Sequence, residues 1–315
     1  MLTYIQSLSL ESLAGRMPSS ISQGLIWGIM ALGVYVTFRI LDIADMSVDG
    51  TFSTGGAVAV MLIVGGTNPW VAVLVATICG LVVGCVTGVL HTRFGIPAIL
   101  SGILSQYSLY SINLAIMNFK ANQAVSVDKY SLIISSRYIN TAIGVGLAFV
   151  VVVIGVLYWF FGTQLGSAVR ATGCNQIMAG AQGININRMK ILGLALSNGI
   201  VAMTGALSAQ YSGFADVNAG RGAIVIGLAA VIIGEVISEA FFGKKINFGI
   251  RMIFIVLGGI IYYIIYSIVL WLKLDPNMMK LFTAIIVAVF LAVPYLKGQS
   301  KNSFAKAGKN SKEAI

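Results

Sequence analysis

Residues 139–162 read INTAIGVGLAFVVVVIGVLYWFFG, and residues 163–185, which follow directly, read TQLGSAVRATGCNQIMAGAQGIN. The first stretch has no charged residue and exceeds the about 20 apolar residues that a helix needs to cross a hydrocarbon core of about 30 Å. The second stretch is polar and has glycines near both ends, which favours a short helix between two spans over a plain loop. We therefore expect a membrane span that leads into a polar helix.

The composition extends this pattern to the whole chain. Of 315 residues, 58% are apolar before the 36 glycines are counted, and only 10% are charged. Because soluble domains carry about 25% charged residues, a soluble enzyme is excluded. The sequence predicts an all-α polytopic membrane protein with about nine helical segments, at 20–39, 51–66, 69–90, 97–117, 139–162, 189–212, 221–239, 249–271 and 279–296.

Two of these segments, 51–66 and 221–239, are short and rich in glycine. We expect them to be broken, tilted or only partly spanning, because lipid tolerates irregular backbone only where protein or a wet cavity covers it. Three regions follow from the pattern: an N-terminal interfacial segment at 1–19, a transmembrane domain at 20–296 that includes the polar segment 163–190, and a basic tail at 297–315.

The basic residues predict an orientation. For an odd number of spans with the C-terminus inside, thirteen Lys and Arg fall inside and seven outside, and five of the thirteen lie in the tail. An excess of basic residues marks the cytoplasmic side, so segment 163–190 and the tail are expected in the cytoplasm. The opposite side receives Arg16, Lys120, Lys129, Arg137, Arg221, Lys273 and Lys280.

A short pattern occurs twice. Residues 44–50, ADMSVDG, lead into the glycine-rich stretch TFSTGGAV, and residues 215–220, ADVNAG, lead into RGAIVIG. In the orientation above, the two copies lie on opposite sides, as an inverted repeat requires, with Asp45, Asp49 and Asp216 at its junctions. Inverted repeats with short, glycine-interrupted helices are typical of transporters. Chance recurrence of Ala-Asp between spans is the alternative.

Enzymatic motifs are absent from the sequence. His91 is the only histidine, so no catalytic arrangement built on several histidines is available, and Cys79, Cys85 and Cys174 are too few and too scattered for a disulfide framework or a metal site. We expect no catalytic residue, metal or cofactor in this chain. The acidic residues fall at helix ends or in loops, which argues against an ion-coupled carrier, with Glu235 and Glu239 as the exceptions to watch.

Two spans carry polar side chains. In 97–117, three serines lie on one helix face, and 189–212 also contains several amides and hydroxyls. These residues either line a wet pathway or form hydrogen bonds between helices. The pathway candidates are Ser101, Ser105, Ser108, Asn113, Asn198 and Gln210. In 69–90, by contrast, Gly80, Gly84 and Gly88 form a ladder that favours close helix packing.

The order of several small motifs resembles a known family. Gly166, Arg170-Ala171, Ala179 and Gly183-Ile184-Asn185, followed by Gly205-Ala206-Leu207 and Val231-Ile232-Ile233-Gly234, are similar to the permease subunits of ATP-binding-cassette (ABC) importers. The group is the one that serves branched-chain amino acids, ribose and related solutes, and the subgroup linked to aromatic amino acids is the nearest. Glu235 departs from this pattern, because many relatives have a second glycine there.

The resemblance implies a non-catalytic translocation subunit in the bacterial plasma membrane. A pair of permeases, expected to be identical, would dock on two ATPase subunits that hold ATP and Mg²⁺, and a solute-binding protein would deliver a small solute such as an amino acid. Segment 163–185 would be the coupling helix, and span 97–117 would line the pore. Nucleic acid is not an expected partner, and the alternative function is an ion-coupled secondary carrier. The coupling candidates are Arg170, Ala171, Asn175, Ala179, Gly180 and Gly183.

Overall fold

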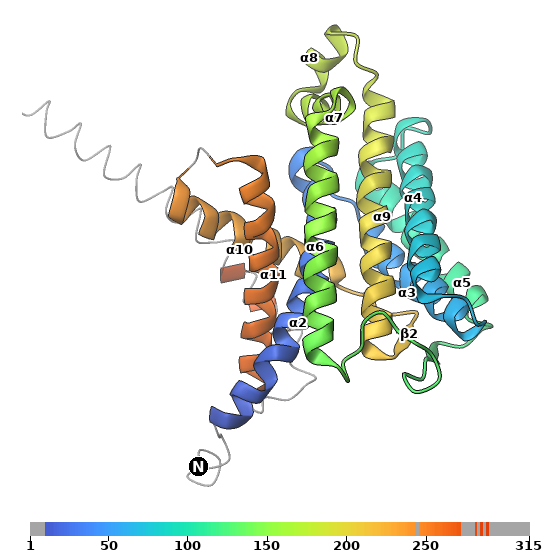
Figure 1. The fold of residues 1–315 in the computed structure, drawn as a ribbon. Coiled ribbons are helices and arrows are strands. Elements are labelled where there is room, and N and C mark those ends of the chain that lie inside the picture. Colours follow the sequence, from blue (N-terminus) through green and yellow to red (C-terminus); the bar gives the residue numbers. More distant parts are fainter. Residues whose placement is uncertain (1–9, 244–245, 272–280, 282–283, 286–287, 290–315) are drawn as a thin grey trace, which may run out of the picture.

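The computed structural model describes residues 10–243 and 246–271, together with 281, 284–285 and 288–289. Long helices dominate this part of the chain (Figure 1). In chain order the elements are α2 (Leu10–Tyr35), η1 (Val36–Ile40), α3 (Val48–Val64), α4 (Pro69–Thr92), α5 (Ala98–Ile116), β1 (Asn122–Ala124), α6 (Ile139–Gly162), α7 (Gln164–Cys174), α8 (Gln176–Ala181), α9 (Ile186–Ser212), β2 (Phe214–Asp216), α10 (Ala223–Phe242) and α11 (Phe248–Trp271).

Seven helices in the described residues are long and apolar enough to cross a membrane, which confirms the predicted all-α polytopic class. Six of the seven match the predicted spans within three residues, and α6 matches 139–162 at both ends. The first span, Leu13–Ile40, begins seven residues before the predicted start at 20, within the segment 1–19 that was predicted to be interfacial. The second predicted span is the shorter helix α3. Helix α10 is continuous over 20 residues, so of the three expected features, a break, a tilt or a partial span, the break is not present. The ninth predicted span falls almost entirely outside the described residues, and the tail 297–315 does so completely.

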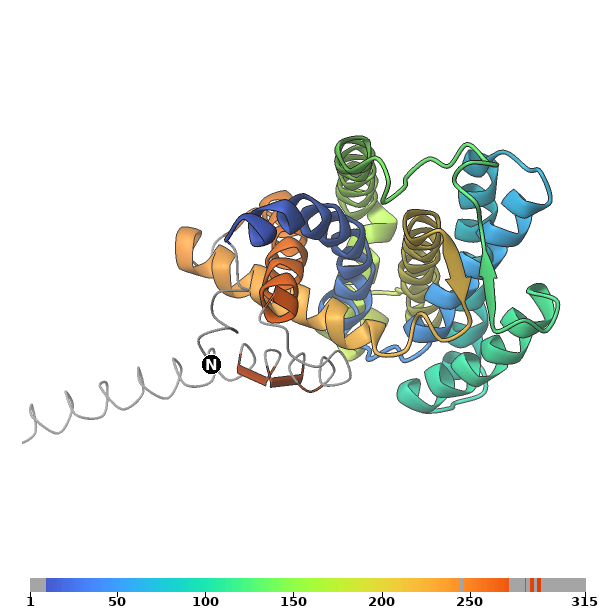
Figure 2. The same cartoon turned by 90° about the horizontal axis from the view of Figure 1, so that it is seen from below.

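Helix α9 lies at the centre of the bundle (Figure 2). In α9 and in the first span, Leu13–Ile40, more than 70% of the apolar window is buried inside the protein, against 22–39% in the other five spans. The outer helices therefore present much of their apolar surface to lipid. Trp70, Leu74 and Val82 on α4 and Val151 and Trp159 on α6 are examples.

The glycine ladder of α4 packs against α9, as the sequence predicts. A Cβ at Gly80 would overlap the carbonyl of Asn198, one at Gly84 the carbonyl of Leu194, and one at Gly88 the backbone of Ile191. Since lipid tails are as apolar as leucine, helices in a bilayer associate by such close backbone packing and not by a hydrophobic driving force. The small residues thus fix the position of α4 against α9.

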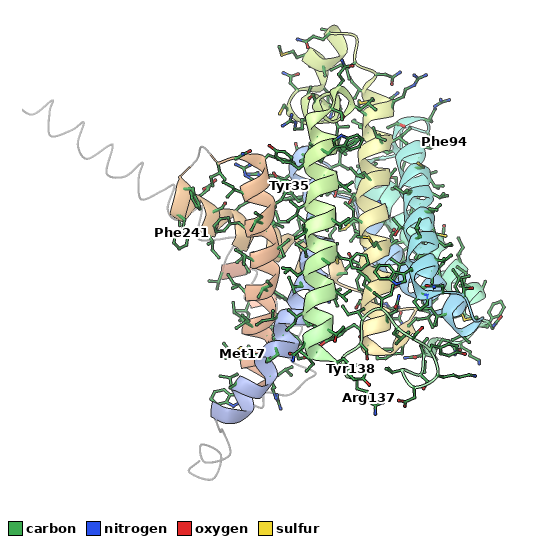
Figure 3. The ribbon with its side chains drawn as sticks, viewed as in Figure 1. Met17, Tyr35, Phe94, Arg137, Tyr138 and Phe241 are labelled. Atoms are coloured by element: carbon green, nitrogen blue, oxygen red, sulfur yellow. The ribbon has the colours of Figure 1, made fainter. Side chains whose placement is uncertain are left out.

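Different structures close the two ends of the bundle. At one end, α7 and α8 lie between α6 and α9; at the other, a two-stranded antiparallel ribbon pairs Asn122 with Asp216 and Ala124 with Phe214 (Figure 1). Figure 3 shows Phe94 at the α7 end and Arg137 and Tyr138 at the ribbon end. The predicted single polar helix is in fact two helices.

The reason for this division is Asn175. It has an extended backbone, and its side-chain oxygen accepts a hydrogen bond from the Met178 amide at 3.0 Å, so it ends α7 and caps α8. Asn185 caps α9 in the same way through the Arg188 amide, at 3.1 Å. At the other end of α9, Gly213 adopts a left-handed conformation with φ of 79°, which turns the chain into β2.

We expect Gly84→Ala to lower the free energy of unfolding by about 1–3 kcal/mol, because the added methyl group forces α4 away from α9. Thermal unfolding of the detergent-purified protein measures the effect. The matched control is Gly155→Ala on α6, where no atom lies within 4 Å of the added Cβ; it should be neutral or stabilising. Equal stability of the two variants would contradict the packing role.

Candidate functional site

A polar cluster lies inside the bundle where the chain enters α3. The Asp45 carboxylate accepts hydrogen bonds from the Ser47 amide at 2.9 Å, the Ser47 hydroxyl at 2.6 Å and the Asn198 side-chain amide at 2.7 Å. The Asn198 oxygen in turn accepts a bond from Thr51 at 2.6 Å. Asn198 lies near the middle of the α9 span, and Asp45 is only 3% exposed. An acidic side chain is therefore buried deep in the bundle.

This position corrects the sequence interpretation of Asp45. The residue does precede a helix, as predicted, but that helix begins inside the protein and not at the membrane surface. The first turn of α3 packs against the middle of α5, since a Cβ at Gly50 would lie 3.1 Å from the Gln106 Cα and 3.0 Å from the Leu109 side chain. A helix end is thus no guide to membrane depth in this fold.

Asp49 joins the beginnings of α3 and α10. Its two carboxylate oxygens accept hydrogen bonds from the Gly222 amide at 2.9 Å and the Ile224 amide at 3.0 Å. The neighbouring Gly220 amide donates to the Ser53 hydroxyl at 3.0 Å. A carboxylate at a helix N-terminus is stabilised by the helix dipole, and Asp49 meets two such ends. The junction between residues far apart in the sequence is therefore held by charge-assisted bonds.

A cavity of about 630 Å³ opens beside this junction. The beginning of α3, the inner turns of α5 and the segment before α10 form its walls. Its lining contains one carboxylate, Asp49, and one guanidinium, Arg221, together with Asn113 and two tyrosines. The full lining is Asp49, Gly50, Ser53, Ile103, Gln106, Tyr107, Tyr110, Asn113, Val217, Asn218 and Arg221.

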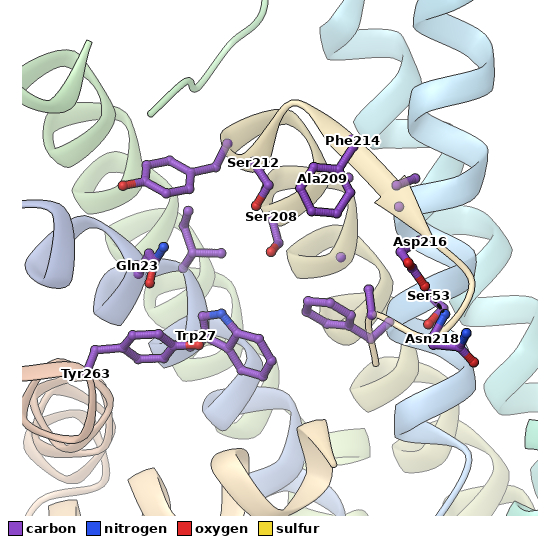
Figure 4. A pocket seen from close by; sticks show the side chains of 17 residues that line it. Gln23, Trp27, Ser53, Ser208, Ala209, Ser212, Phe214, Asp216, Asn218 and Tyr263 are labelled. Atoms are coloured by element: carbon purple, nitrogen blue, oxygen red, sulfur yellow. Dashed lines mark hydrogen bonds between the residues drawn. The ribbon is translucent and has the colours of Figure 1, made fainter. Parts of the chain in front are cut away.

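A second cavity of about 410 Å³ lies between α2, α3, α9 and α11 (Figure 4). It shares Ser53 and Asn218 with the first cavity. Trp27 and Phe52 stack there, with ring centroids 5.0 Å apart, and Tyr263 packs 5.8 Å from Trp27. Its polar groups include Gln23, Ser208, Ser212 and Asp216. The two cavities thus meet at the segment that follows β2.

Among the predicted pathway residues, Asn113 lines the larger of these two cavities, and the other five line neither. Ser105 is buried and accepts a hydrogen bond from Thr87 of α4 at 2.8 Å, and Ser101 is buried and bonds its own helix. Ser108 is exposed and donates to the Leu104 carbonyl.

In α9, Asn198 belongs to the Asp45 cluster, and the Gln210 oxygen accepts a bond from the Ile133 amide at 3.1 Å. The contacts of Ser105 and Asn198 match the alternative of hydrogen bonds between helices, whereas Gln210 bonds the segment that precedes α6.

The predicted junction residues take different positions. Asp45 lies in the buried cluster, Asp49 lies at the α10 entrance, and Asp216 ends β2, where its side chain accepts a bond from the Asn218 amide at 2.6 Å. The inverted repeat itself stays a prediction. Sequence reasoning counted Arg221 only among the basic residues of the outer side and did not single it out as a site residue, whereas the structure shows that it lines the larger cavity. The signal was present in Gly220-Arg221-Gly222, where two glycines flank a charge at the start of a span.

The predicted coupling residues lie on α7 and α8 and in the turn that follows. Arg170 donates to the Phe161 carbonyl at 3.0 Å and lies 5.9 Å from the Phe248 ring centroid, which anchors α7 to α6 and α11. Asn175, Gly180 and Gly183 are exposed, and Ala171 is partly so. Ala179 is buried, however, whereas its neighbours Ile177 and Met178 are exposed. The outward surface of α8 is therefore apolar.

Glu235 and Glu239 lie toward the end of α10. Glu235 accepts a hydrogen bond from Arg39 at 3.0 Å and is half-buried, and Glu239 is exposed. Among the described residues, no group of three or more His, Cys, Asp and Glu side chains lies close enough together to hold a metal ion.

Seven spanning helices around buried polar groups and two cavities define a multi-pass membrane protein. The chain belongs to the family described as branched-chain amino acid transport system permease component, whose pattern matches residues 17–294. It is thus a permease component of a transport system, which confirms the resemblance seen in the sequence.

Individual relatives agree with this assignment. The chain is 40% identical to the tyrosine transport system permease protein of Clostridioides difficile over 91% of this chain and 94% of the relative. An uncharacterized protein of Rickettsia prowazekii is 33% identical over 87% and 96% of the two chains. The ribose import permease protein of Escherichia coli is 25% identical over 68% and 67%. No solved structure matches.

We expect Asn198→Leu to destabilise the protein by about 1–3 kcal/mol, because the buried Asp45 carboxylate loses its amide partner. Thermal unfolding in detergent is the measurement. Thr204→Val is the matched control on the same helix, since Thr204 donates only to the Ile200 carbonyl one turn away, and it should change the unfolding free energy by less than about 1 kcal/mol. A mild effect of Asn198→Leu would mean that Asp45 has another way to satisfy its charge.

Proposed function

We propose that this permease is the translocation subunit of an ABC importer for an amino acid, with tyrosine or another aromatic amino acid as the substrate. The observation that carries the proposal is the 40% identity over nearly the whole chain to a tyrosine transport system permease. The family resemblance supplies the expected partners: a second permease, two ATPase subunits and a solute-binding protein. The permease itself performs no covalent chemistry.

The structure supports an ATPase docking role for α7 and α8. Ile177 is 88% exposed at the end of the molecule, and Met178 beside it is also exposed. Exposed apolar side chains on a short helix that projects beyond the spans are typical of a protein interface. Arg170 ties α7 to α6 and α11, so a displacement of α7 and α8 by a partner would be transmitted to the spans.

The ion-coupled carrier remains the second candidate because of one observation. Asp45 is an acidic side chain buried at the depth of the α9 midpoint, and such residues mark ion or proton pathways in many membrane proteins. Its carboxylate already accepts three hydrogen bonds, however, which suits a structural role equally well. Membership of the permease family favours the importer over the ion-coupled carrier.

The experiment that tests the importer reconstitutes the permease in proteoliposomes with the ATPase that co-purifies with it and with the solute-binding protein. Uptake of labelled L-tyrosine should require ATP and the binding protein and should be indifferent to an imposed proton or sodium gradient. Uptake that follows the ion gradient without ATP would favour the carrier.

We expect Ile177→Asp to abolish recovery of the ATPase with the permease and to lower ATP-driven uptake by roughly tenfold or more, because a charge replaces an apolar contact in the centre of the interface. Quantitative co-purification is the measurement. The control is Tyr138→Asp, which places the same charge at an exposed site at the opposite end of α6. It should leave ATPase recovery unchanged. If the ATPase were fully recovered with the Ile177→Asp variant, α8 would not be part of the ATPase interface.

A further inference from the structure

We propose that the larger cavity is a binding site for a zwitterionic amino acid in transit, with the substrate carboxylate on Arg221 and its ammonium group on Asp49 and Asn113. This inference rests on the proposed function and adds a recognition step within the permease itself. One anionic and one cationic side chain face the same cavity of about 630 Å³, which is within the range of small-molecule sites.

Arg221 is available for a carboxylate. Its backbone amide bonds to the Asn218 carbonyl, but the guanidinium forms no ion pair within the part of the chain that the structure describes. A guanidinium presents five N–H donors in a planar fork that matches a carboxylate. Arg221 is exposed where it lines the cavity, so its guanidinium is accessible to a ligand.

Asp49 has spare acceptor capacity. Its carboxylate accepts backbone hydrogen bonds from Gly222 and Ile224, and the Ala223 amide also interacts with it. An ionised carboxylate offers about four acceptor positions, so about one is left for a ligand. The carboxylate is therefore held in place by α10 and can still accept from an ammonium group. Because α3 and α10 both begin here, its negative charge is also stabilised by two helix dipoles.

The Asn113 side chain gives independent support for a ligand in the larger cavity. This side chain is 1% exposed and lines the cavity, and neither its amide nitrogen nor its oxygen has a hydrogen-bond partner among the described residues. Leaving a buried polar group unpaired costs about 1–3 kcal/mol. A ligand with both donors and acceptors satisfies both atoms, since the ammonium group donates to the oxygen and the carboxylate accepts from the nitrogen.

The remaining walls suit an aromatic side chain. Tyr107 and Tyr110 line the cavity from successive positions on one face of α5, and Tyr107 is 73% exposed. Aromatic rings prefer offset or edge-to-face contact with another ring. The family resemblance places the equivalent of α5 at the pore, so the cavity would open onto the route of the substrate.

The smaller cavity does not offer the same recognition. Its lining holds Asp216 but no lysine, arginine or histidine, so it has no cationic partner for a carboxylate. An amine without a carboxylate would suit it equally well. Analogues of the amino acid that lack one charge therefore distinguish the two cavities.

The test uses the complete importer in nanodiscs without the solute-binding protein. Labelled L-tyrosine should bind and be displaced by L-phenylalanine, whereas tyramine, which lacks the carboxylate, and 3-(4-hydroxyphenyl)propionate, which lacks the ammonium group, should compete at least about tenfold more weakly. Tyramine that competes as well as L-phenylalanine would overturn the role of Arg221. If 3-(4-hydroxyphenyl)propionate competed as well as L-phenylalanine, the proposed role of Asp49 and Asn113 would be overturned.

Two variants locate the site. Arg221→Gln and Asn113→Leu should each weaken L-tyrosine binding and ATP-driven uptake roughly tenfold or more, while ATP hydrolysis by the complex persists. Asn113→Leu should also leave thermal stability unchanged or raise it, because it removes unpaired polar atoms. If Asn113 had only a structural role, Asn113→Leu would instead lower the thermal stability and leave L-tyrosine binding normal.

The matched control is Arg137→Gln, which removes an arginine of the ribbon end that pairs with Asp128 outside both cavities. It should bind and transport normally. Normal binding in both cavity variants would overturn the proposal. Failure of the proposed function looks different, because the wild-type importer would then show no ATP-dependent uptake even if L-tyrosine bound with the expected selectivity.

Discussion

The architecture depends on contact between the backbones of helices around α9. Gly55 of α3 lies against the Ala202 carbonyl, Gly84 of α4 lies against Leu194, and Gly205 of α9 itself lies against Phe52. In lipid these contacts replace the hydrophobic effect as the source of specificity, since any apolar side chain is as well accommodated by the bilayer as by the protein. Once α3 and α4 are held so closely, their polar residues have fixed partners on α9, and the Asp45 cluster is a direct consequence.

The spans and the close-packing helix were predictable because their signals are local. An uninterrupted apolar run defines α6, and glycines at every fourth position identify the packing face of α4 without knowledge of the partner. The serines of α5 carried no such information. Ser105 bonds Thr87 of α4, and periodicity places a serine on a face without revealing whether that face meets water or another helix.

The candidate site was harder to predict because it is assembled from helix ends within the bundle. Sequence analysis takes an acidic residue beside a helix end as lying near the membrane surface, and it placed Asp45 and Asp49 at helix ends or in loops. That inference fails where a short helix such as α3 begins among its neighbours and not at the bilayer surface. Segments α7 and α8 were foreseen as polar, but only the fold distinguishes the buried Ala179 from the exposed Ile177.

The small ribbon of β1 and β2 has a mechanical consequence. It pairs the segment that follows α5 with the segment that leads to α10, and residues of α5 and of the segment before α10 both line the larger cavity. Because backbone hydrogen bonds tie the two strands in register, these segments cannot separate at the ribbon unless those hydrogen bonds break.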